Sequence, residues 1–253
     1  MLLAENVSKN FNGLKALDKI SLKIEKGEIF ALIGPNGAGK TTFFNILTGI
    51  YPQTEGTIKF ENRNTSGLKP HQIAKLGIAR TFQNLRLFHQ MTVLENILSG
   101  FFFHTKYTVL DSIFRTKRFK EIEDKNLKSA YYLSEFMGLE NKINEIAKNL
   151  PYGEQKKLEV ARALANKPKL LLLDEPTAGM NPNETQEMME LIKKIRENGI
   201  FVLLIEHDMR VVMNIPDRVI VFDYGEKIAE GTPDEIRNNE KVIAAYLGKT
   251  YDT

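Results

Sequence analysis

The segment Gly34-Pro35-Asn36-Gly37-Ala38-Gly39-Lys40-Thr41-Thr42 restricts the fold and chemistry of this chain more than any other. It follows the apolar run Ile29–Ile33, which has the length of a buried strand, and it opens a helix predicted from about Gly39 to just before Gly49. Glycines let successive backbone N–H groups point at one anion, and the start of a helix adds positive potential. The pattern G-x-x-x-x-G-K-[ST] in this setting therefore predicts a phosphate-binding loop rather than a turn that only caps a helix.

Two side chains of this loop indicate which phosphate compound it binds. The Lys40 ammonium is expected to contact the β- and γ-phosphates of a nucleotide, and the Thr41 hydroxyl is expected to ligate Mg²⁺. Kinases, GTPases and many ATPases share such a loop, so a second site has to select among these reactions.

Two carboxylates at the end of a second apolar strand supply that selection. Leu170–Leu173 leads directly into Asp174 and Glu175, and the carboxyl ends of parallel strands form the ligand edge of a sheet. Asp174 is predicted to lie in the Mg²⁺ shell, and Glu175 to accept a proton from the attacking water or to orient it. A carboxylate beside the metal ligand favours hydrolysis over phosphoryl transfer. The alternative without chemistry is that both acids cap a loop before Pro176.

His207 comes just after a further apolar strand, Phe201–Ile205. A lone histidine is usually structural, but this position again faces the ligand edge, where a neutral imidazole could hydrogen-bond the γ-phosphate and the water. We therefore predict Glu175, His207 and Lys40 as the catalytic residues. For Gln83, spacing alone predicts only an exposed loop.

The pattern of apolar residues predicts an α/β fold interrupted by a helical segment. Short β-rich runs fill the first third, and after Pro151 helices and strands alternate, which is typical of βαβ units in a parallel sheet. Between Thr92 and Leu150 the period is helical, and the charged run Arg115–Lys125 reads as a solvated helical face or a mobile insert. Strands are expected at Leu2–Val7, Ile20–Ile24, Ile29–Ile33, Thr57–Phe60, Leu170–Leu173, Ile200–Ile205, Arg218–Asp223 and Lys227–Glu230, and helices at Glu154–Ala165 and Asn183–Asn198.

Composition excludes several classes of function. The 253 residues include 35 basic and 32 acidic side chains, a balance that gives no support for binding nucleic acid. There is no cysteine, so disulfides, thiolate metal sites and thiol nucleophiles are excluded. No run approaches 18 uninterrupted apolar residues, so we expect a soluble chain whose membrane role, if any, comes through a partner.

Together these segments resemble the ATP-binding subunits of ABC transporters, and the resemblance covers essentially the whole chain. It implies ATP and Mg²⁺ as cofactors. It also implies a P-loop NTPase fold with a RecA-like parallel-sheet core, an N-terminal antiparallel β subdomain and an inserted α-helical subdomain. Residues 1–83 and 151–253 would form the catalytic core of a single domain, and residues 84–150 the helical subdomain.

The resemblance assigns roles that spacing does not. Phe11 matches the aromatic residue that stacks on adenine, so it joins residues 34–42 and Gln83 in the predicted nucleotide site. Gln83 matches a glutamine that senses Mg²⁺ and the transmembrane partner, which adds it to Thr41 and Asp174 as a metal contact. Ala178-Gly179-Met180-Asn181 matches the loop that crosses a dimer interface, although Asn181-Pro182-Asn183-Glu184 also reads as a capping box.

Residues 151–155 occupy the position of the family's signature segment, which meets the γ-phosphate bound by a second subunit. Here this segment departs from the usual pattern, because Pro151 replaces a serine, Tyr152 a glycine and Glu154 a glutamine. A contact with the opposite nucleotide would then rest on backbone N–H groups and the helix dipole. The segment reads Pro151, Tyr152, Gly153, Glu154 and Gln155.

These departures indicate the subfamily. The Pro-Tyr-Gly signature, the Gly-Met-Asn-Pro loop and the insert Phe101–Asp124 resemble the larger ATPase subunit of branched-chain amino-acid importers, as does the ending Ala245-Tyr246-Leu247-Gly248.

The run Thr232-Pro233-Asp234-Glu235 is a further capping box.

The resemblance implies partners and location. It implies a second ATPase subunit, either a shorter paralogue or a copy of this chain, and two membrane permeases seated on a helical segment at about Asn84–Ser99. Leu85, Leu87, Phe88 and Met91 could form a groove for a permease helix or belong to the core. An external solute-binding protein would deliver the substrate, and the chain would lie peripherally on the cytoplasmic side of the inner membrane. Alternatives are ATPases for urea or amide import or lipopolysaccharide export, a soluble ABC ATPase acting on DNA or ribosomes, and a small-molecule kinase.

Overall fold

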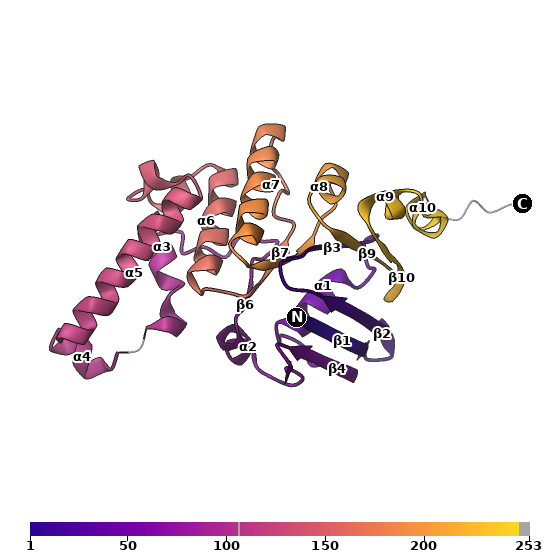
Figure 1. Cartoon of the computed structure of the whole chain (residues 1–253), viewed down its shortest axis with the longest axis horizontal. Helices are drawn as coiled ribbons and strands as arrows, with labels where there is room; N and C mark the ends of the chain where they lie inside the picture. The colour runs from indigo at the N-terminus through magenta and orange to yellow at the C-terminus, as the bar shows by residue number, and fades with distance from the viewer. Residues whose placement is uncertain (106, 248–253) are drawn as a thin grey trace, which may run out of the picture.

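A computed structural model describes residues 1–105 and 107–247 of the chain (Figure 1). Lys106 of the predicted insert and Gly248 of the predicted ending lie outside the described residues. Within them the chain forms two sheets, one of mixed direction and one antiparallel, with helices on both sides of the larger sheet. This is the α/β fold predicted above.

The larger sheet is parallel except for β10, which pairs antiparallel with β9 at one edge. The central strands β3, β7 and β8 are buried along their whole length, as strands covered on both faces must be. The strands in sheet order are β10 (Glu226–Gly231), β9 (Arg218–Asp223), β3 (Ile29–Ile33), β8 (Phe201–Ile205), β7 (Leu170–Asp174) and β6 (Ile78–Arg80).

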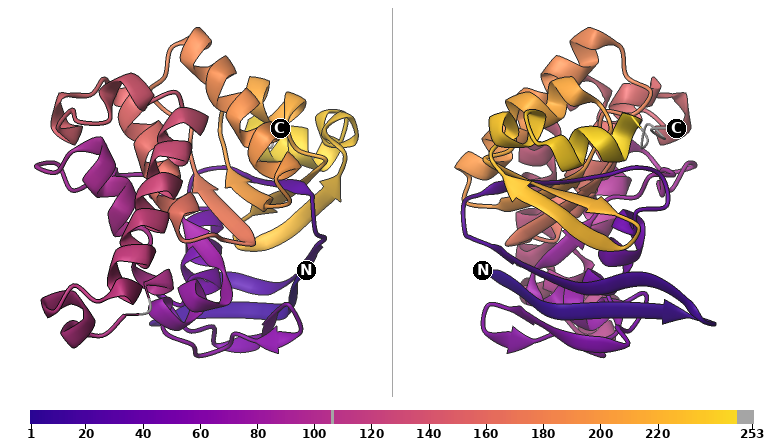
Figure 2. Two further views of the ribbon diagram at one scale, coloured as in Figure 1. Left: turned by 60° about the vertical axis from the view of Figure 1, so that its left-hand side comes forward. Right: turned by 90° about the vertical axis from the view of Figure 1, so that its right-hand side faces the viewer.

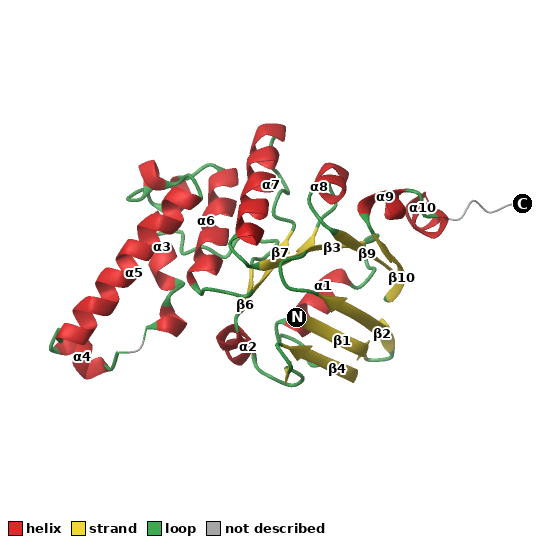
Figure 3. Ribbon diagram, viewed as in Figure 1, coloured by secondary structure: helices red, strands yellow, loops and turns green. Residues whose placement is uncertain are grey.

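Alternate residues of these strands pack into two separate cores. In β3, Ile29, Ala31 and Ile33 face a core shared with helices, while Phe30 and Leu32 face the other side. The helices that contribute to the first core include α6 (Tyr152–Ala165), α7 (Pro182–Glu197), α8 (Met209–Asn214), α9 (Pro233–Arg237) and α10 (Glu240–Leu247). The chain therefore has three layers, with helices uppermost in Figure 3.

The second face of the larger sheet is covered by α1 (Lys40–Leu47) and by the antiparallel sheet. Phe43 and Phe44 of α1 are fully buried between β3 and the N-terminal strands, which lie below the larger sheet in both views of Figure 2. The antiparallel strands in sheet order are β2 (Leu14–Ile24), β1 (Leu2–Phe11), β4 (Glu55–Phe60) and β5 (Arg63–Asn64). The first strands are longer than the sequence predicted, because polar residues near the hairpin pair through their backbones.

A helical part stands at the side of this core. Helix α5 packs against α3 and α6, and its exposed charges make the predicted solvated face. None of the described helices combines the length and apolarity that crossing a membrane requires. The boundaries predicted at residues 83/84 and 150/151 stay predictions. The remaining helices are α2 (Pro70–Leu76), α3 (Val93–Ser99), α4 (Val109–Ile113) and α5 (Lys117–Phe136), with single turns at Phe102–His104, Glu140–Lys142 and Ala147–Asn149.

The prediction of a helical segment over Asn84–Ser99 is wrong for its first half, because α3 begins only at Val93. The Asn96 amide holds the preceding chain in a loop: its Oδ1 accepts from the Phe88 N–H at 2.9 Å, and its Nδ2 donates to the Thr92 carbonyl at 3.0 Å. The Thr92 hydroxyl then caps α3. Of the apolar residues in the segment, Leu87 is core, whereas Phe88 and Met91 are exposed.

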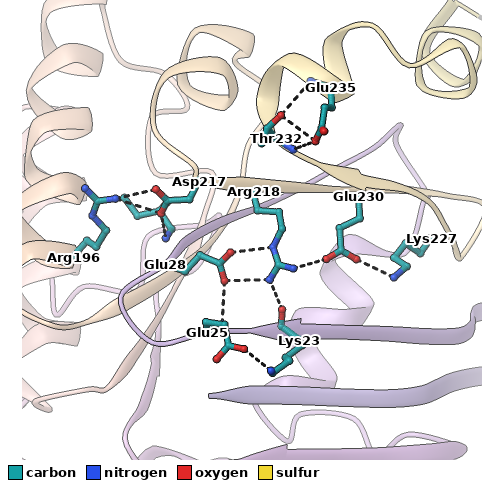
Figure 4. A network of polar contacts seen from close by, with 11 residues as sticks. Lys23, Glu25, Glu28, Arg196, Asp217, Arg218, Lys227, Glu230, Thr232 and Glu235 are labelled. Carbon is teal, nitrogen blue, oxygen red and sulfur yellow. Dashed lines mark hydrogen bonds and ion pairs between the residues drawn. The ribbon is translucent and has the colours of Figure 1, made fainter.

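An arginine network fastens the two sheets together (Figure 4). Arg218 of β9 donates to Glu28 Oε1 at 2.9 Å and to Glu230 Oε1 at 2.8 Å, and it also reaches the Lys23 carbonyl at the end of β2. Its guanidinium lies 4.7 Å from the centre of the Phe30 ring. One side chain thus ties β9, β10 and β2 to the turn before β3.

Replacing Arg218 by alanine is expected to lower the free energy of unfolding by about 1–3 kcal/mol, because charge-assisted bonds are lost and partly buried acceptors remain. Urea denaturation followed by circular dichroism measures this change. The exposed Arg63 of β5 is the matched control, and its alanine variant should stay within about 0.5 kcal/mol of the parent. Equal stability of both variants would contradict the fastening role.

Candidate functional site

The predicted site residues come together because of strand order. Strand β8 lies between β3 and β7, and the three strands are parallel, so the loops after them open on the same edge. The loop after β3 is the predicted phosphate loop, the loop after β7 carries Glu175, and the loop after β8 carries His207. The sequence prediction of one shared edge is confirmed.

Two glycines of the loop are required by close backbone approach. A Cβ on Gly34 (φ +149°) would lie 2.0 Å from the Phe222 carbonyl oxygen, and one on Gly39 (φ +98°) would lie 2.7 Å from the Ala16 carbonyl oxygen. Only glycine fits at such positions. The loop is therefore pressed against β9 on one side and the β1–β2 hairpin on the other.

Lys40 lies inside this loop and is only 6% exposed. Its Nζ donates to the Gly34 carbonyl at 2.6 Å and to the Pro35 carbonyl at 2.8 Å. Burial lowers the pKa of the Lys40 ammonium, and the nearby carboxylates of Glu175 and Asp174 oppose that shift. The ammonium thus sits between the loop and the two acids.

Among the described α-helices, α1, α2 and α6 begin without an N-cap side chain that accepts a hydrogen bond, and the starts of α1 and α6 are predicted phosphate contacts. Helix α1 follows Gly39 with no side-chain cap and no acid in its first turn, and α6 follows Pro151 with no side-chain cap. Uncapped N–H groups at a helix start bind anions well. By contrast, a threonine, asparagine or aspartate side chain caps α3, α4, α5, α7, α8 and α9.

The Glu175 carboxylate lies between two predicted partners. Its Oε1 is 2.9 Å from His207 Nε2, and its Oε2 accepts from Gln83 Nε2 at 3.1 Å. Gln83 is exposed on a loop, as spacing predicted, and it also reaches the site, as the resemblance implied. Glu175 adopts φ +50°, a left-handed conformation that is uncommon for glutamate and often found at functional positions.

Asp174 forms a buried ion pair that the sequence analysis did not foresee. Its Oδ2 accepts from Arg80 Nη2 at 2.8 Å, and the two side chains are 5% and 6% exposed. Arg80 also donates to Asn45 Oδ1 of α1 at 2.7 Å and lies 5.1 Å from the Phe82 ring centre. Arg80 therefore connects the helix after the phosphate loop, the acidic strand end and the segment leading to Gln83.

A buried glutamate links the loops that carry Glu175 and His207. Glu206 is 3% exposed; its Oε1 accepts from the Thr177 hydroxyl at 2.7 Å and from the Thr177 N–H at 3.0 Å. Its Oε2 accepts from the His207 N–H at 3.1 Å. An acid placed directly after the apolar strand Phe201–Ile205 was the sequence signal for such a buried contact, and it went unused.

Two buried charged residues of α6 hold the Gln83 segment. Lys156 Nζ donates to the carbonyl oxygens of Gln83 and Glu175, both at 3.3 Å. Glu159 Oε1 accepts from the Phe82 N–H at 3.3 Å and from the Arg86 N–H at 3.2 Å. Burial raises the pKa of Glu159, and these N–H groups together with Lys156 oppose that shift. Charged residues three positions apart on the inward face of a helix are the signal by which they could have been predicted.

Replacing Lys156 by methionine is expected to lower kcat for ATP hydrolysis about tenfold, because the loss of a charge-assisted hydrogen bond weakens the positioning of Gln83 and Glu175 by ~1.5–3 kcal/mol. Steady-state phosphate release gives kcat and KM. Since neither bond touches nucleotide, KM should change little, and Lys156→Arg should restore most of the rate. The neighbouring Lys157, which pairs with the exposed Glu187, is the matched control. A purely structural role would instead appear as lost stability with an unchanged kcat.

The signature residues contact their own subunit in specific ways. The Tyr152 ring lies against Gly179, where an added Cβ would be 3.0 Å from Cε1. Glu154 accepts from Lys142 Nζ at 2.6 and 2.7 Å, and Gln155 Nε2 donates to the Leu150 carbonyl at 2.8 Å. Pro151 and Tyr152 are exposed at the start of α6, and Gly153 is buried.

Other predicted residues have more local settings. Phe11, at the end of β1, makes an edge contact with Tyr51 at 5.3 Å between ring centres, and its role against adenine stays a prediction. Asn181 caps α7 by accepting from the N–H groups of Asn183 and Glu184 at 3.0 Å, so its capping box is confirmed. The capping box at Thr232 is confirmed as well.

Comparison with known proteins agrees with this geometry. The family model of ABC transporters matches residues 17–178, and that of the branched-chain amino acid ATP-binding cassette transporters matches residues 226–252. The high-affinity branched-chain amino acid transport ATP-binding protein LivG of Salmonella typhimurium is 46% identical over 250 residues, 98% of each chain.

Solved structures are also similar. The ADP conformation of MJ1267, an ATP-binding cassette of an ABC transporter, is 34% identical with a TM-score of 0.85, covering 98% of this chain and 99% of that one. A dimeric post-hydrolysis state of the cassette MJ0796, bound to ADP and Pi, is 28% identical with a TM-score of 0.79, covering 92% and 99%. This chain therefore belongs to the ABC transporter ATP-binding proteins, in the group of branched-chain amino acid transport.

Proposed function

We propose that this chain is the ATP-hydrolysing subunit that energises an importer of branched-chain amino acids. One observation carries the enzymatic part: the Glu175 carboxylate stands between His207 Nε2 and Gln83 Nε2, on the sheet edge that also holds the phosphate loop. The similarity to LivG over 98% of the chain carries the solute class.

The residues of the edge suit a magnesium nucleotide. The uncapped start of α1 and the buried Lys40 offer donors to phosphate oxygens, and Phe11 is proposed to pack on the base. Hydroxyl and carboxylate oxygens are the ligands that Mg²⁺ prefers, so Thr41 and Asp174 would hold it, with Gln83 beside them. When bound, Mg²⁺ would supply positive charge to the β- and γ-phosphate oxygens.

Glu175 would then act on the attacking water. Its carboxylate is proposed to accept the water proton. His207 Nε2 lies 2.9 Å from that carboxylate, and with nucleotide bound the same N–H would donate to the γ-phosphate instead. The Glu175 backbone is fixed from two sides, because its N–H donates to the Ile205 carbonyl at 3.0 Å and its carbonyl accepts from Lys156 at 3.3 Å. The base is thus positioned before substrate arrives.

A second ATPase subunit would complete the site. The start of α6 is uncapped and exposes Pro151 and Tyr152, which suits backbone contact with a phosphate held by another subunit. Glu154 is neutralised by Lys142, so its carboxylate would repel that phosphate less. The similar cassette MJ0796 is dimeric in its ADP- and Pi-bound state. The partner is proposed to be a shorter paralogue or a second copy of this chain.

A groove between the helical part and the core is the proposed seat of a permease. It encloses about 1600 Å³ and is lined by residues of α2, by Phe82 and by the exposed Phe88. Glu159 and Arg162 of α6 lie in its wall, so a helix bound there would touch the residues that hold the Gln83 segment. The chain would work peripherally on the cytoplasmic face of the inner membrane, with a solute-binding protein outside.

Solute uptake tests this function. Cells that lack this gene should lose most of their uptake of radiolabelled leucine and isoleucine at low external concentration, because the importer then has no ATP-hydrolysing subunit of this kind. The parent gene should restore uptake, and the Glu175→Gln variant should not. Uptake of urea and short amides, and export of lipopolysaccharide, should be unchanged. A defect in one of those and not in leucine uptake would reassign the system.

A further inference from the structure

The tip of the helical part carries apolar side chains that are largely exposed. In and just after α4, Leu110 is 64% exposed, Ile113 66% and Phe114 75%. We call these three residues the α4 tip. Figure 1 shows α4 at the free end of α5, farthest along that helix from α6. Side chains of this size are seldom left in water together without a function.

Local hydrogen bonds hold the tip in this exposed form. Thr108 caps α4 and Asp111 bonds back to it, with 2.8 Å between the Thr108 N–H and Asp111 Oδ2. The Thr116 hydroxyl donates to Asp111 Oδ1 at 3.0 Å. Behind the tip, the rings of Tyr107 and Phe119 pack 4.8 Å apart. The hairpin therefore half-buries Tyr107 and Phe119 and presents Leu110, Ile113 and Phe114 outward.

Positive charge lies next to the tip. Arg115, Lys117, Arg118 and Lys120 are all exposed within six residues of Phe114, and Asp111 is the only acid between residues 107 and 120. The acids Glu121, Glu123 and Asp124 follow farther along α5. The Asp111 carboxylate already accepts hydrogen bonds from Thr108 and Thr116. Lys117 lies 3.9 Å from Glu121 with both side chains largely exposed, a weak pair. Within the described chain the other three cations form no ion pair.

This combination has the chemistry of an anionic bilayer surface. Exposed Leu, Ile and Phe beside Lys and Arg are typical of segments that insert shallowly among lipid headgroups. Each basic side chain near such a surface adds about fivefold in affinity, through attraction to acidic lipids. A permease helix would need apolar contact but no excess of positive charge. The charge therefore favours lipid as the occupant.

The tip also lies on the appropriate side of the molecule. Phe102, Tyr107 and Glu123, which flank the tip in sequence, line the groove proposed to seat the permease. In Figure 1 both α4 and the groove helix α2 lie on the lower side, whereas α7 and α8 stand on the upper side. A permease in the groove would bring the membrane toward this side, a step that rests on the proposed function.

We propose that the α4 tip and its basic neighbours bind the surface of a bilayer rich in anionic phospholipid. The contact would be a second attachment to the membrane, made by this chain's own residues and independent of nucleotide.

Vesicle flotation of the full-length protein tests this inference. We expect a partition coefficient at least ~10-fold higher on vesicles with 40 mol% phosphatidylglycerol than on pure phosphatidylcholine, falling steeply between 50 and 500 mM NaCl. Leu110→Ser/Ile113→Ser/Phe114→Ser should lower it at least ~10-fold. The triple variant Leu14→Ser/Tyr224→Ser/Ile243→Ser, which changes exposed apolar residues elsewhere, is the matched control and should bind normally.

The outcomes separate this inference from the proposed function. The lipid contact is overturned if the parent does not bind acidic vesicles, or if the tip variant binds them as well as the parent does. Either result leaves the uptake test unaffected. If the parent ignores protein-free vesicles but the tip variant loses binding to membranes that hold the permeases, the tip contacts protein instead. Because the assay contains neither ATP nor permease, a failed uptake test leaves a positive vesicle result standing.

Discussion

Glu175→Gln is expected to lower kcat for ATP hydrolysis at least ~100-fold while leaving ATP affinity within a few fold, because a general base contributes 10²–10⁴ in rate. The glutamine keeps the size of the side chain, and its carbonyl oxygen can still accept from Gln83 or from His207, so the change removes basicity with little change in shape. Single-turnover phosphate release measures the rate, and fluorescent nucleotide titration measures the affinity.

The same variant should accumulate as an ATP-bound dimer on size-exclusion chromatography with ATP, since hydrolysis no longer separates the subunits. Glu197→Gln, an exposed change on α7, is the control and should turn over normally. Turnover within about tenfold of the parent would remove Glu175 as the base. A monomer in the presence of saturating ATP would instead contradict the proposed nucleotide-dependent pairing.

Lys40→Ala is expected to raise the Kd for ATP about 10- to 100-fold, because charge-assisted bonds to phosphate contribute ~1.5–3 kcal/mol and each 1.4 kcal/mol is tenfold. The effect should be specific to the phosphates. Affinity for ADP should fall less than affinity for ATP, since the γ-phosphate is absent from ADP. Isothermal titration with both nucleotides measures the difference.

Folding has to be separated from binding in this variant. Among the described residues, Lys40 bonds only to carbonyl oxygens of its own loop, and burial already disfavours its charge. Its removal should therefore leave the urea midpoint nearly unchanged. Lys194→Ala on the exposed face of α7 is the control for loss of a positive charge. An unchanged Kd for ATP would refute the assignment of the phosphate loop.

The sequence was informative where one local pattern has one structural outcome. The apolar strand Leu170–Leu173 leads into two acids, and the apolar strand Ile29–Ile33 leads into a glycine-rich turn. Continuous apolar strands are typical of parallel sheets, so these two runs alone predicted that both loops open on one edge. Capping boxes at Asn181 and Thr232 were equally local and formed as expected. The signature and the adenine contact came from resemblance, not from spacing.

The missed residues act over long distances in the sequence. Arg80 pairs with Asp174, 94 positions away, and Lys156 reaches the Gln83 carbonyl across 73. No period or spacing encodes such contacts, because they depend on how β6, β7 and α6 come together. The helix predicted over Asn84–Met91 does not form, also because of contacts outside that segment. The Asn96 amide and the backbone of residues 145–148 hydrogen-bond the backbone groups that a helix would pair internally.

The Arg218 network has a consequence for the thermodynamics of binding. One guanidinium joins β2, β10 and the turn before β3. It therefore ties together, at their other ends, the strands that lead to the aromatic end of the β1–β2 hairpin and to the glycine loop after β3. A ligand spanning base and phosphates then has little conformational entropy to remove from this half of its site. In the parent, the loss of conformational entropy on nucleotide binding should therefore come mainly from the helical part. In Arg218→Ala the β-strand half must be ordered as well, so calorimetry should give a more unfavourable entropy of nucleotide binding than for the parent.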